Sequence, residues 1–217
     1  SGTVAVNADG LSVDYTPAAN FNGTEVITYT VSDGTLTDAT GTLTVTVTAV
    51  NDTPVAVADT ATVAEDSSKS INVIANDTDV DSGDTLTLTA ATTAGNGTVA
   101  VNADGLSVDY TPAANFNGTE VITYTVSDGT LTDATGTLTV TVTAVNDTPV
   151  AVADVLTVAE DAALTSKDVI ANDTDIDGDT LSLTAVTTAG SGTVAVNADG
   201  LSVDYTPAAN FNGTEVI

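Results

Sequence analysis

Hydrophobic and polar residues alternate along most of this chain. The stretch TLTVTVTAV at 137–145 places Leu138, Val140 and Val142 between threonines, and EVITYTV at 120–126 follows the same rule. A period of two puts successive side chains on opposite faces of an extended strand, whereas a helix would repeat every ~3.6 residues. The pattern therefore predicts strands with one buried face and one solvated face.

Turn sequences separate the alternating stretches. NADG at 102–105 is typical of a tight hairpin, and SDG at 127–129 marks a second turn. No helical pattern competes with the alternation, which predicts seven strands in one unit, near residues 56–63, 69–74, 85–92, 97–101, 106–111, 120–127 and 134–144. Seven short antiparallel strands in about 100 residues indicate an all-β, immunoglobulin-like sandwich.

The chain repeats itself with a period of 95 residues. Residues 1–50 match 96–145 at all but the first position, and 191–217 repeats 1–27 letter for letter. We therefore expect three segments: the C-terminal half of a repeat at 1–50, a complete repeat at 51–145, and a repeat lacking its last strands at 146–217. Because these edges fall inside predicted strands, we expect either a window of a longer array or strands supplied by a neighbouring chain.

The composition is strongly acidic. The 217 residues include 30 Asp and Glu, 2 Lys and Arg together and no His, so the formal net charge is −28. Such a charge repels nucleic acid and anionic membranes, so we expect neither as a partner. No run of 18 apolar residues is present, and we expect no membrane insertion. A hydrophobic fraction of 42% is enough for packed cores, which argues against a disordered acidic tail.

The densest acidic stretches are DTDVDSGDT at 77–85 and its counterpart DTDIDGDT at 173–180. Four carboxylates in so short a loop repel one another unless a cation gathers them, and calcium takes about six to eight oxygen ligands. DTDIDGD is similar to the start of an EF-hand loop, but Thr184 stands where the closing glutamate would be. The sequence therefore predicts a calcium-binding loop in a β-sandwich, with the ligands Asp77, Asp79, Asp81, Asp84, Asp173, Asp175, Asp177 and Asp179.

Other acidic and amide residues recur at the same period and are candidates to complete the calcium sites. They lie in the motifs AED, VNDTP, NGTE and SDG, and comprise Glu65, Asp66, Glu160, Asp161, Asn51, Asp52, Asn146, Asp147, Glu120 and Asp128. We expect the AED and VND groups to converge at one end of a sandwich, where one repeat meets the next. Isolated acids such as Asp104 and Asp109 are interpreted as solvated turn residues.

Two motifs resemble those of a known family. ANDTDVDSGDTLTL is similar to the cadherin segment that carries the D-x-D calcium motif, and VNDTP is similar to the cadherin inter-domain linker. More closely, the whole unit resembles the bacterial cadherin-like or VCBS-type tandem repeats of giant secreted surface adhesins, and this resemblance covers all 217 residues.

The resemblance implies tandem immunoglobulin/cadherin-like antiparallel β-sandwiches with calcium near the domain junctions. It further implies export by a type I or similar route and a role in adhesion or biofilm formation. By motif match it assigns Asp79 and Asp81 to the D-x-D pair, Glu65 to the first-strand acid, and Asn51 with Asp52 to the linker. The cadherin DRE element has no clear match, and Glu120 is the candidate that stands in for it.

Catalysis has little support in this sequence. Without His or Cys there is no Ser-His-Asp or Cys-His arrangement and no histidine-based zinc site. Two carboxylates can hydrolyse a glycoside, but here the same acids recur in every unit, so we expect no enzyme. The threonine rows at 42–48 and 137–143 resemble the flat arrays of ice-binding proteins, but they are interpreted as the solvated face of strands.

These observations predict calcium-stiffened structural spacer repeats of an extracellular bacterial adhesin, at the cell surface or secreted. The expected partners are calcium, neighbouring repeats of the same chain and, through other regions, a cell surface or matrix. One alternative is the subunit of an extracellular filament, in which strands from another copy complete the sandwich. Another is a carbohydrate-binding sandwich, which the few aromatic residues disfavour because the alternation places them inward.

Overall fold

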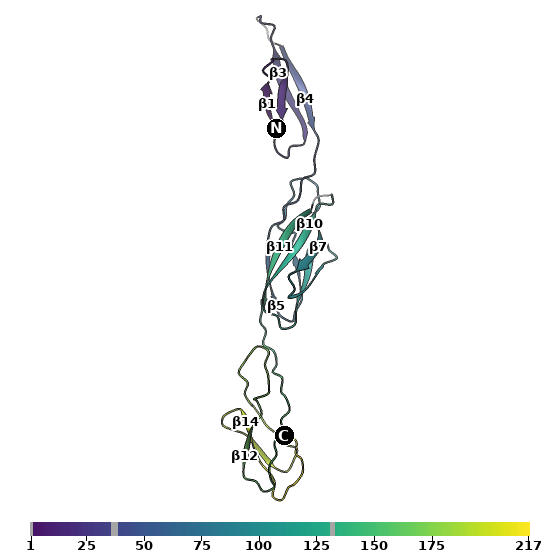
Figure 1. Cartoon of the computed structure of the whole chain (residues 1–217). Coiled ribbons are helices and arrows are strands. Elements are labelled where there is room, and N and C mark those ends of the chain that lie inside the picture. The colour runs from purple at the N-terminus through teal and green to yellow at the C-terminus, as the bar shows by residue number, and fades with distance from the viewer. Residues whose placement is uncertain (1, 36–38, 131–132) are drawn as a thin grey trace. The chain divides into compact units, whose positions relative to one another are not determined.

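A computed structural model describes residues 2–35, 39–130 and 133–217 (Figure 1). These residues form strands and no helix, which confirms the all-β fold class. It follows that no helix among them is long and apolar enough to cross a membrane. The chain divides into two compact units, Ser1–Ala144 and Val145–Ile217.

The first unit begins with two antiparallel hairpins. Strand β1 (Thr3–Val6) pairs with β2 (Val13–Thr16), and β3 (Gly23–Val31) pairs with β4 (Ala39–Val47). The predicted alternation is present in the second hairpin, but both of its faces are largely exposed to solvent.

Residues 51–144 contain two sheets made of seven strands, as predicted. The larger sheet has the order β5-β11-β10-β7 and the smaller one the order β6-β9-β8. All neighbours are antiparallel except β5 and β11, which run parallel. The bounds are β5 Asp59–Ala64, β6 Lys69–Asn72, β7 Thr87–Thr93, β8 Gly97–Val101, β9 Ser107–Pro112, β10 Gly118–Ser127 and β11 Asp133–Thr143.

The inward positions of the two sheets form the core of this segment. Along β10 and β11 each buried residue alternates with a more exposed threonine or valine over most of the length, which confirms the period-two prediction. Tyr110 and Tyr124 are both fully buried. The whole buried set is Val63, Ile71, Val73, Ile74, Leu88, Val108, Tyr110, Ile122, Tyr124, Val126, Leu138, Val140 and Val142. Burial of this aliphatic and aromatic surface is the main stabilising contribution to the fold.

One glycine in β11 has a steric role beside the core. Gly136 pairs with Tyr124 across the β10–β11 ladder, and the tyrosine ring covers it. A Cβ atom at position 136 would lie 2.2 Å from the ring carbon Cζ of Tyr124. Since a real Cβ cannot approach that closely, the buried tyrosine requires glycine at this position.

The second unit has a three-stranded sheet of order β12-β14-β13, with bounds Thr165–Asp168, Ser202–Thr206 and Thr193–Val196. It has the same antiparallel register as β6-β9-β8: Lys167 lies opposite Val203, as Ile71 lies opposite Val108. The two sheets are therefore equivalent, and residues of the two repeats can be compared position by position.

Candidate calcium-binding site

The acidic loop at 77–84 joins β6 to β7 and is fixed against the segment that precedes β5. The backbone N–H of Val55 donates to the carbonyl oxygen of Thr78 at 2.7 Å, and Thr78 donates back to Val55 at 3.1 Å. This pair of hydrogen bonds holds the loop next to the linker residues that begin the repeat. The sequence therefore brings together two regions that are about 25 residues apart in the chain.

Three of the four predicted loop ligands form a tight cluster. One carboxylate oxygen from each of Asp79, Asp81 and Asp84 lies within 4.8 Å of the other two. Two oxygens bound to one calcium ion at about 2.4 Å can be at most about 4.8 Å apart. The spacing of the three carboxylates is therefore compatible with one shared calcium ion.

Hydrogen bonds within the loop orient two of these carboxylates. The Asp81 N–H donates to Oδ1 of Asp79 at 2.7 Å, and the Asp52 N–H donates to Oδ2 of Asp81 at 2.6 Å. The second oxygen of Asp79, Oδ2, is buried and has no hydrogen-bond partner among the described residues. A buried carboxylate oxygen without a donor is costly, so the loop has the chemistry of a cation site.

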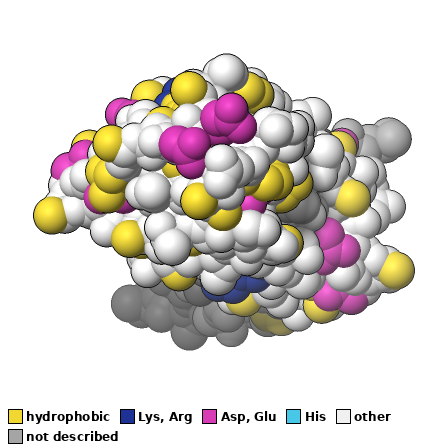
Figure 2. Space-filling model, turned by 90° about the horizontal axis from the view of Figure 1, so that it is seen from below, with side chains coloured by type: hydrophobic (Ala, Val, Ile, Leu, Met, Phe, Trp, Pro, Cys, Tyr) yellow, Lys and Arg dark blue, Asp and Glu magenta, His cyan; other side chains and the backbone are white. Residues whose placement is uncertain are grey.

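Desolvation and neighbouring charges both act on the third member, Asp84. Partial desolvation, followed by the charges of Asp79, Asp81 and Asp128, raises the pKa of Asp84. No lysine or arginine reaches this cluster among the described residues. Figure 2 shows the same imbalance on the face it displays, where Asp and Glu side chains far outnumber Lys. A bound divalent cation would relieve this repulsion.

Two further predicted residues meet beside the cluster. Asn51 donates from Nδ2 to Oδ2 of Asp128 at 2.8 Å. The other oxygen of Asp128 accepts from the N–H and the hydroxyl of Thr130, both at 2.7 Å. Asp128 is buried and forms the turn that follows β10, so its described contacts connect that turn to the linker.

Three further predicted ligands, Glu65, Asp66 and Glu120, lie at the other end of β10. Gly118 begins β10 opposite Val142, and Ser127 ends it opposite Asp133, so Glu120 and Asp128 are at opposite ends of the sheet. Glu65 follows β5 and its N–H donates to the carbonyl of Thr143, at the same end as Glu120. Asp66 accepts from the N–H of Asn115 at 3.2 Å.

Glu120 is 1% exposed and its carboxylate is surrounded by donors. It accepts from the hydroxyl of Thr93, from the N–H of Gly95 at 3.2 Å and from Nδ2 of Asn96 at 2.8 Å. Burial alone would raise the pKa of Glu120, but these hydrogen bonds outweigh it and leave the pKa below its usual value. Glu65 is also buried and lies 3.4 Å from Nδ2 of Asn117.

Asp77 lies apart from the cluster that it precedes in sequence. Its Oδ1 accepts from the N–H of Val57 at 2.7 Å, and its Oδ2 is buried without a partner among the described residues. Burial raises the pKa of Asp77, and the charge of Asp59 adds to the effect. Asp59 in turn accepts from the hydroxyl of Tyr124 at 2.8 Å. The sequence reasoning did not identify Asp59, although AVAD recurs at 56–59 and 151–154.

The second unit repeats backbone hydrogen bonds of the loop, but not the cluster. Among the described residues only Asp79, Asp81 and Asp84 bring three carboxylates within 4.8 Å of one another, and their counterparts Asp175, Asp177 and Asp179 do not. The N–H of Asp147 donates to Oδ2 of Asp177 at 2.7 Å, and the N–H of Asp177 donates to Oδ1 of Asp175 at 2.9 Å. Asp179 also donates its N–H to Asp175, at 3.3 Å. Three other predicted residues make the same contacts as their counterparts: Asp173 accepts from the N–H of Val152, Asp161 accepts from the N–H of Asn210, and Asn146 donates to the carbonyl of Asp147. Glu160 is exposed.

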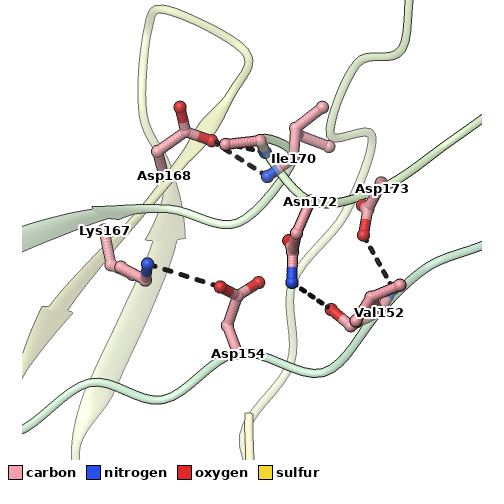
Figure 3. Close-up of polar contacts among 8 residues, drawn as sticks. Val152, Asp154, Lys167, Asp168, Ile170, Asn172 and Asp173 are labelled. Carbon is pink, nitrogen blue, oxygen red and sulfur yellow. Dashed lines mark hydrogen bonds and ion pairs between the residues drawn. The ribbon is translucent and has the colours of Figure 1, made fainter.

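One difference between the two repeats lies on the core side of the sheet. Lys167 occupies the position of the buried Ile71, and its Nζ lies 3.3 Å from Oδ1 of Asp154, the counterpart of Asp59 (Figure 3). Asp168 beside it accepts from the N–H of Ile170 at 2.9 Å, as Asn72 accepts from Ile74. One repeat therefore supplies a cation to this aspartate where the other supplies none among its described residues.

Replacing Lys167 with methionine is expected to change the free energy of unfolding of the second unit by less than about 1 kcal/mol, because partly exposed ion pairs contribute little. The lysine side chain is 37% exposed, which supports this estimate. Urea unfolding at low and high salt measures the change, with Lys69→Met as the matched control. A loss of several kcal/mol would show that the ion pair organises the unit.

Comparison with known proteins places these segments in one family. The family model described as bacterial Ig domain matches residues 1–47, 51–142 and 146–217. No curated protein sequence matches the chain.

Three solved structures illustrate the similarity. The human desmocollin-1 ectodomain is 14% identical with a TM-score of 0.39, and the match covers 97% of this chain and 44% of that one. The endo-fucoidan hydrolase MfFcnA4 of glycoside hydrolase family 107 is 18% identical with a TM-score of 0.36, covering 96% and 33%. Domains 4–9 of the surface layer protein SbsC are 19% identical with a TM-score of 0.33, covering 98% and 34%. The chain spans less than half the length of each, and similarity at this level carries no argument about function.

Proposed function

This chain belongs to the bacterial Ig domain family, and we propose that its repeats are calcium-stiffened spacers of an extracellular bacterial surface adhesin. Immunoglobulin-like domains of this kind are structural modules rather than a type of enzyme. In a linear array each repeat contacts mainly its neighbours. The flexibility of the joints between repeats therefore sets the length and the stiffness of such an array, and with them the distance from the cell at which it holds another domain.

One observation carries this proposal. The buried, unpartnered Oδ2 of Asp79 lies in a three-carboxylate cluster that is hydrogen-bonded to the linker through Asp52. Asp79, Asp81 and Asp84 would hold the ion, which when bound supplies two positive charges and a fixed coordination shell. The chain's own part is to anchor the linker at Asp81, so that the loop and the entry of the repeat move as one body.

Charge explains why the stiffness of the joint would depend on the ion. The segment 51–145 contains 13 acidic residues and one lysine, so its formal charge is −12. Neighbouring repeats of this charge repel one another when nothing neutralises the acidic loops. Calcium bound beside the linker would remove part of that repulsion, and its coordination by the loop carboxylates would fix the loop and the linker in one geometry, which favours a stiff joint over a hinged one.

Small-angle X-ray scattering of the whole chain tests the proposal. We expect chelation with EDTA to broaden the distribution of intramolecular distances, and Asp79→Asn with Asp81→Asn to reproduce this broadening in calcium. The matched control removes two charges elsewhere in the same repeat, with Asp109→Asn and Asp133→Asn, and should respond to calcium as the wild type does. Identical scattering with and without calcium would exclude calcium stiffening.

A second candidate function is the subunit of an extracellular filament. In the second unit a groove of about 1010 Å³ is lined by apolar side chains that include Val152, Val186 and Phe211. The hairpin β3–β4 exposes the side chains of Tyr29 and Leu43, which are 41% and 39% exposed, whereas their counterparts Tyr124 and Leu138 are fully buried. A hairpin from one copy would complement the groove of another by strand addition.

Electron microscopy separates the two functions. The filament predicts regular fibres that Tyr29→Glu abolishes, because a charge on the inserted hairpin cannot be buried in an apolar groove. The spacer predicts single chains with and without this substitution. Fibres formed by the wild type and by Tyr29→Glu alike would contradict the strand-addition model.

A further inference from the structure

The outer face of the sheet β5-β11-β10-β7 consists almost entirely of threonines. Its members alternate with the buried core positions of the same strands, so they point away from the core. We call this surface the threonine face, and it comprises Thr60, Thr62, Thr87, Thr89, Ala90, Thr92, Thr119, Val121, Thr123, Thr125, Thr135, Thr137, Thr139, Thr141 and Thr143.

Formal charges lie only at the rim of this face among the described residues. Asp133 stands at the first position of β11. Lys69 reaches the β5 edge, where its Nζ donates to the carbonyl of Thr62 at 2.9 Å. The segment that carries the face has a formal charge of −12, but most of its acidic side chains lie in loops. Asp59 and Glu120 belong to strands of this sheet and lie on its core side.

Several hydroxyls of the threonine face are already hydrogen-bonded to its own backbone. On β7, the hydroxyls of Thr87 and Thr89 donate to β10 carbonyls at 3.3 Å, and that of Thr92 does so at 3.5 Å. Thr143 donates to the carbonyl of Val63 at 3.4 Å. Because a buried hydroxyl is costly only when it lacks a partner, these contacts lower the cost of removing the face from water.

One large hydrophobic residue lies within the threonine face. Val121 is 45% exposed, pairs with Thr139 across the ladder, and is flanked along β10 by Thr119 and Thr123. The same arrangement recurs in the first hairpin, where Val26 is 60% exposed and pairs with Thr44. The chain therefore presents this exposed valine among threonines more than once.

We propose that the threonine face is a self-association surface through which two copies of this chain pack sheet against sheet, with Val121 near the two-fold axis. Anionic partners are repelled by the net charge, and cationic ones are attracted to the acidic loops. A second copy can approach closely only where neither chain carries charge, and this face meets that condition. Two-fold contacts use the same patch on both partners.

The expected strength of the contact follows from the size of the face. Four strands spaced ~4.8 Å apart and about eight residues long give roughly 500 Å² on each copy. The total of roughly 1,000 Å² is at the lower limit for a specific interface, so one pair of faces associates weakly. Recurrence of the face along a tandem array would multiply the contacts and strengthen the association by avidity.

Salt distinguishes this contact from an ionic one. Screening shortens the range of the repulsion between acidic chains, from a Debye length of about 10 Å at 0.1 M to about 3 Å at 1 M. Association through the threonine face should therefore strengthen as salt rises. It should also persist in EDTA, so it can succeed or fail independently of the calcium site.

Sedimentation velocity of the full chain in EDTA, at low and high NaCl, tests the proposal. We expect concentration-dependent dimers at high salt and an association constant at least about tenfold lower for Val121→Glu, which sets two like charges against each other. Thr98→Glu adds the same charge on the exposed side of β8 and should leave association unchanged. Equal effects of the two substitutions, monomers throughout, or capture of a neutral glycan by a monomeric chain would each overturn the proposal.

Cysteine cross-linking tests the geometry directly, because the natural chain has no cysteine. Sheets packed face to face lie about 10 Å apart, farther than the roughly 4.4–6.8 Å between Cα atoms that a disulfide spans. A short bis-maleimide should therefore join Val121→Cys chains into covalent dimers and leave Thr98→Cys chains monomeric. Circular dichroism confirms that both variants are folded. Dimers in solution that Val121→Cys fails to trap would contradict the two-fold arrangement.

Discussion

Saturating calcium is expected to raise the midpoint temperature of the unfolding transition of residues 51–144 by roughly 10–20 °C. A ligand at about 100 times its Kd adds about 2.7 kcal/mol to the folded state, and about 1 kcal/mol shifts the midpoint of a domain of this size by about 4–8 °C. Differential scanning calorimetry in calcium and in EDTA measures the shift. Superimposable scans would contradict it.

The double substitution Asp79→Asn and Asp81→Asn is expected to have opposite effects on stability without and with calcium. Each asparagine keeps the oxygen that accepts the loop hydrogen bond but removes a charge from the cluster. Without calcium, the variant should therefore be at least as stable as the wild type, because the repulsion is relieved. With calcium, it should be less stable, since it loses most of the calcium shift. A variant that keeps the full shift would exclude these two residues as ligands.

Glu120→Ala is expected to lower the free energy of unfolding of the same segment by about 3 kcal/mol. The substitution removes the charged acceptor that Thr93, Gly95 and Asn96 share, and a hydrogen bond to a charged group contributes about 1.5–3 kcal/mol. Gly95 and Asn96 are exposed, so water satisfies their donors and the loss stays well below the sum of three such bonds. Urea unfolding with an unchanged m-value measures the loss. Thr119→Ala, on the exposed side of the same strand, is the control and should change stability by less than about 0.5 kcal/mol. A loss for Glu120→Ala no larger than that of the control would contradict the role of the buried carboxylate.

The same residue predicts a pH dependence. Because the pKa of Glu120 is lower in the folded chain than in the unfolded one, its carboxylate stabilises the fold above the unfolded pKa. This contribution is lost as the pH falls through the folded value. Glu120→Gln should therefore flatten the acid limb of the stability profile, and a profile as steep as that of the wild type would assign the limb to other carboxylates.

Strand positions in this protein could be predicted well from the sequence, because alternation reports burial directly. Ile122, Tyr124 and Val126 are all fully buried on one face of β10, as the pattern indicated. Alternation along LSVDYT at 106–111 predicts that Leu106 shares the buried face of Val108 and Tyr110, but Leu106 is 37% exposed. It precedes β9 and its N–H donates to the turn residue Asp104, so the turn rather than the strand period sets its direction.

The candidate site was only partly predictable. The D-x-D spacing led to Asp79 and Asp81, which lie together with Asp84. The same run gave no sign that Asp77 turns away toward the backbone of Val57, because a one-dimensional pattern does not record which way a loop side chain points. The network of Asp59 and Tyr124 joins residues 65 positions apart, and only the packing of β5 beside the other strands brings them together.

The calcium site itself is tested most directly by a crystal structure of residues 1–217 grown in millimolar calcium. We predict an ion in contact with Oδ2 of Asp79 and with the carboxylates of Asp81 and Asp84, at the ~2.3–2.6 Å typical of calcium. Well-defined density with these three carboxylates turned apart, and no ion among them, would contradict it.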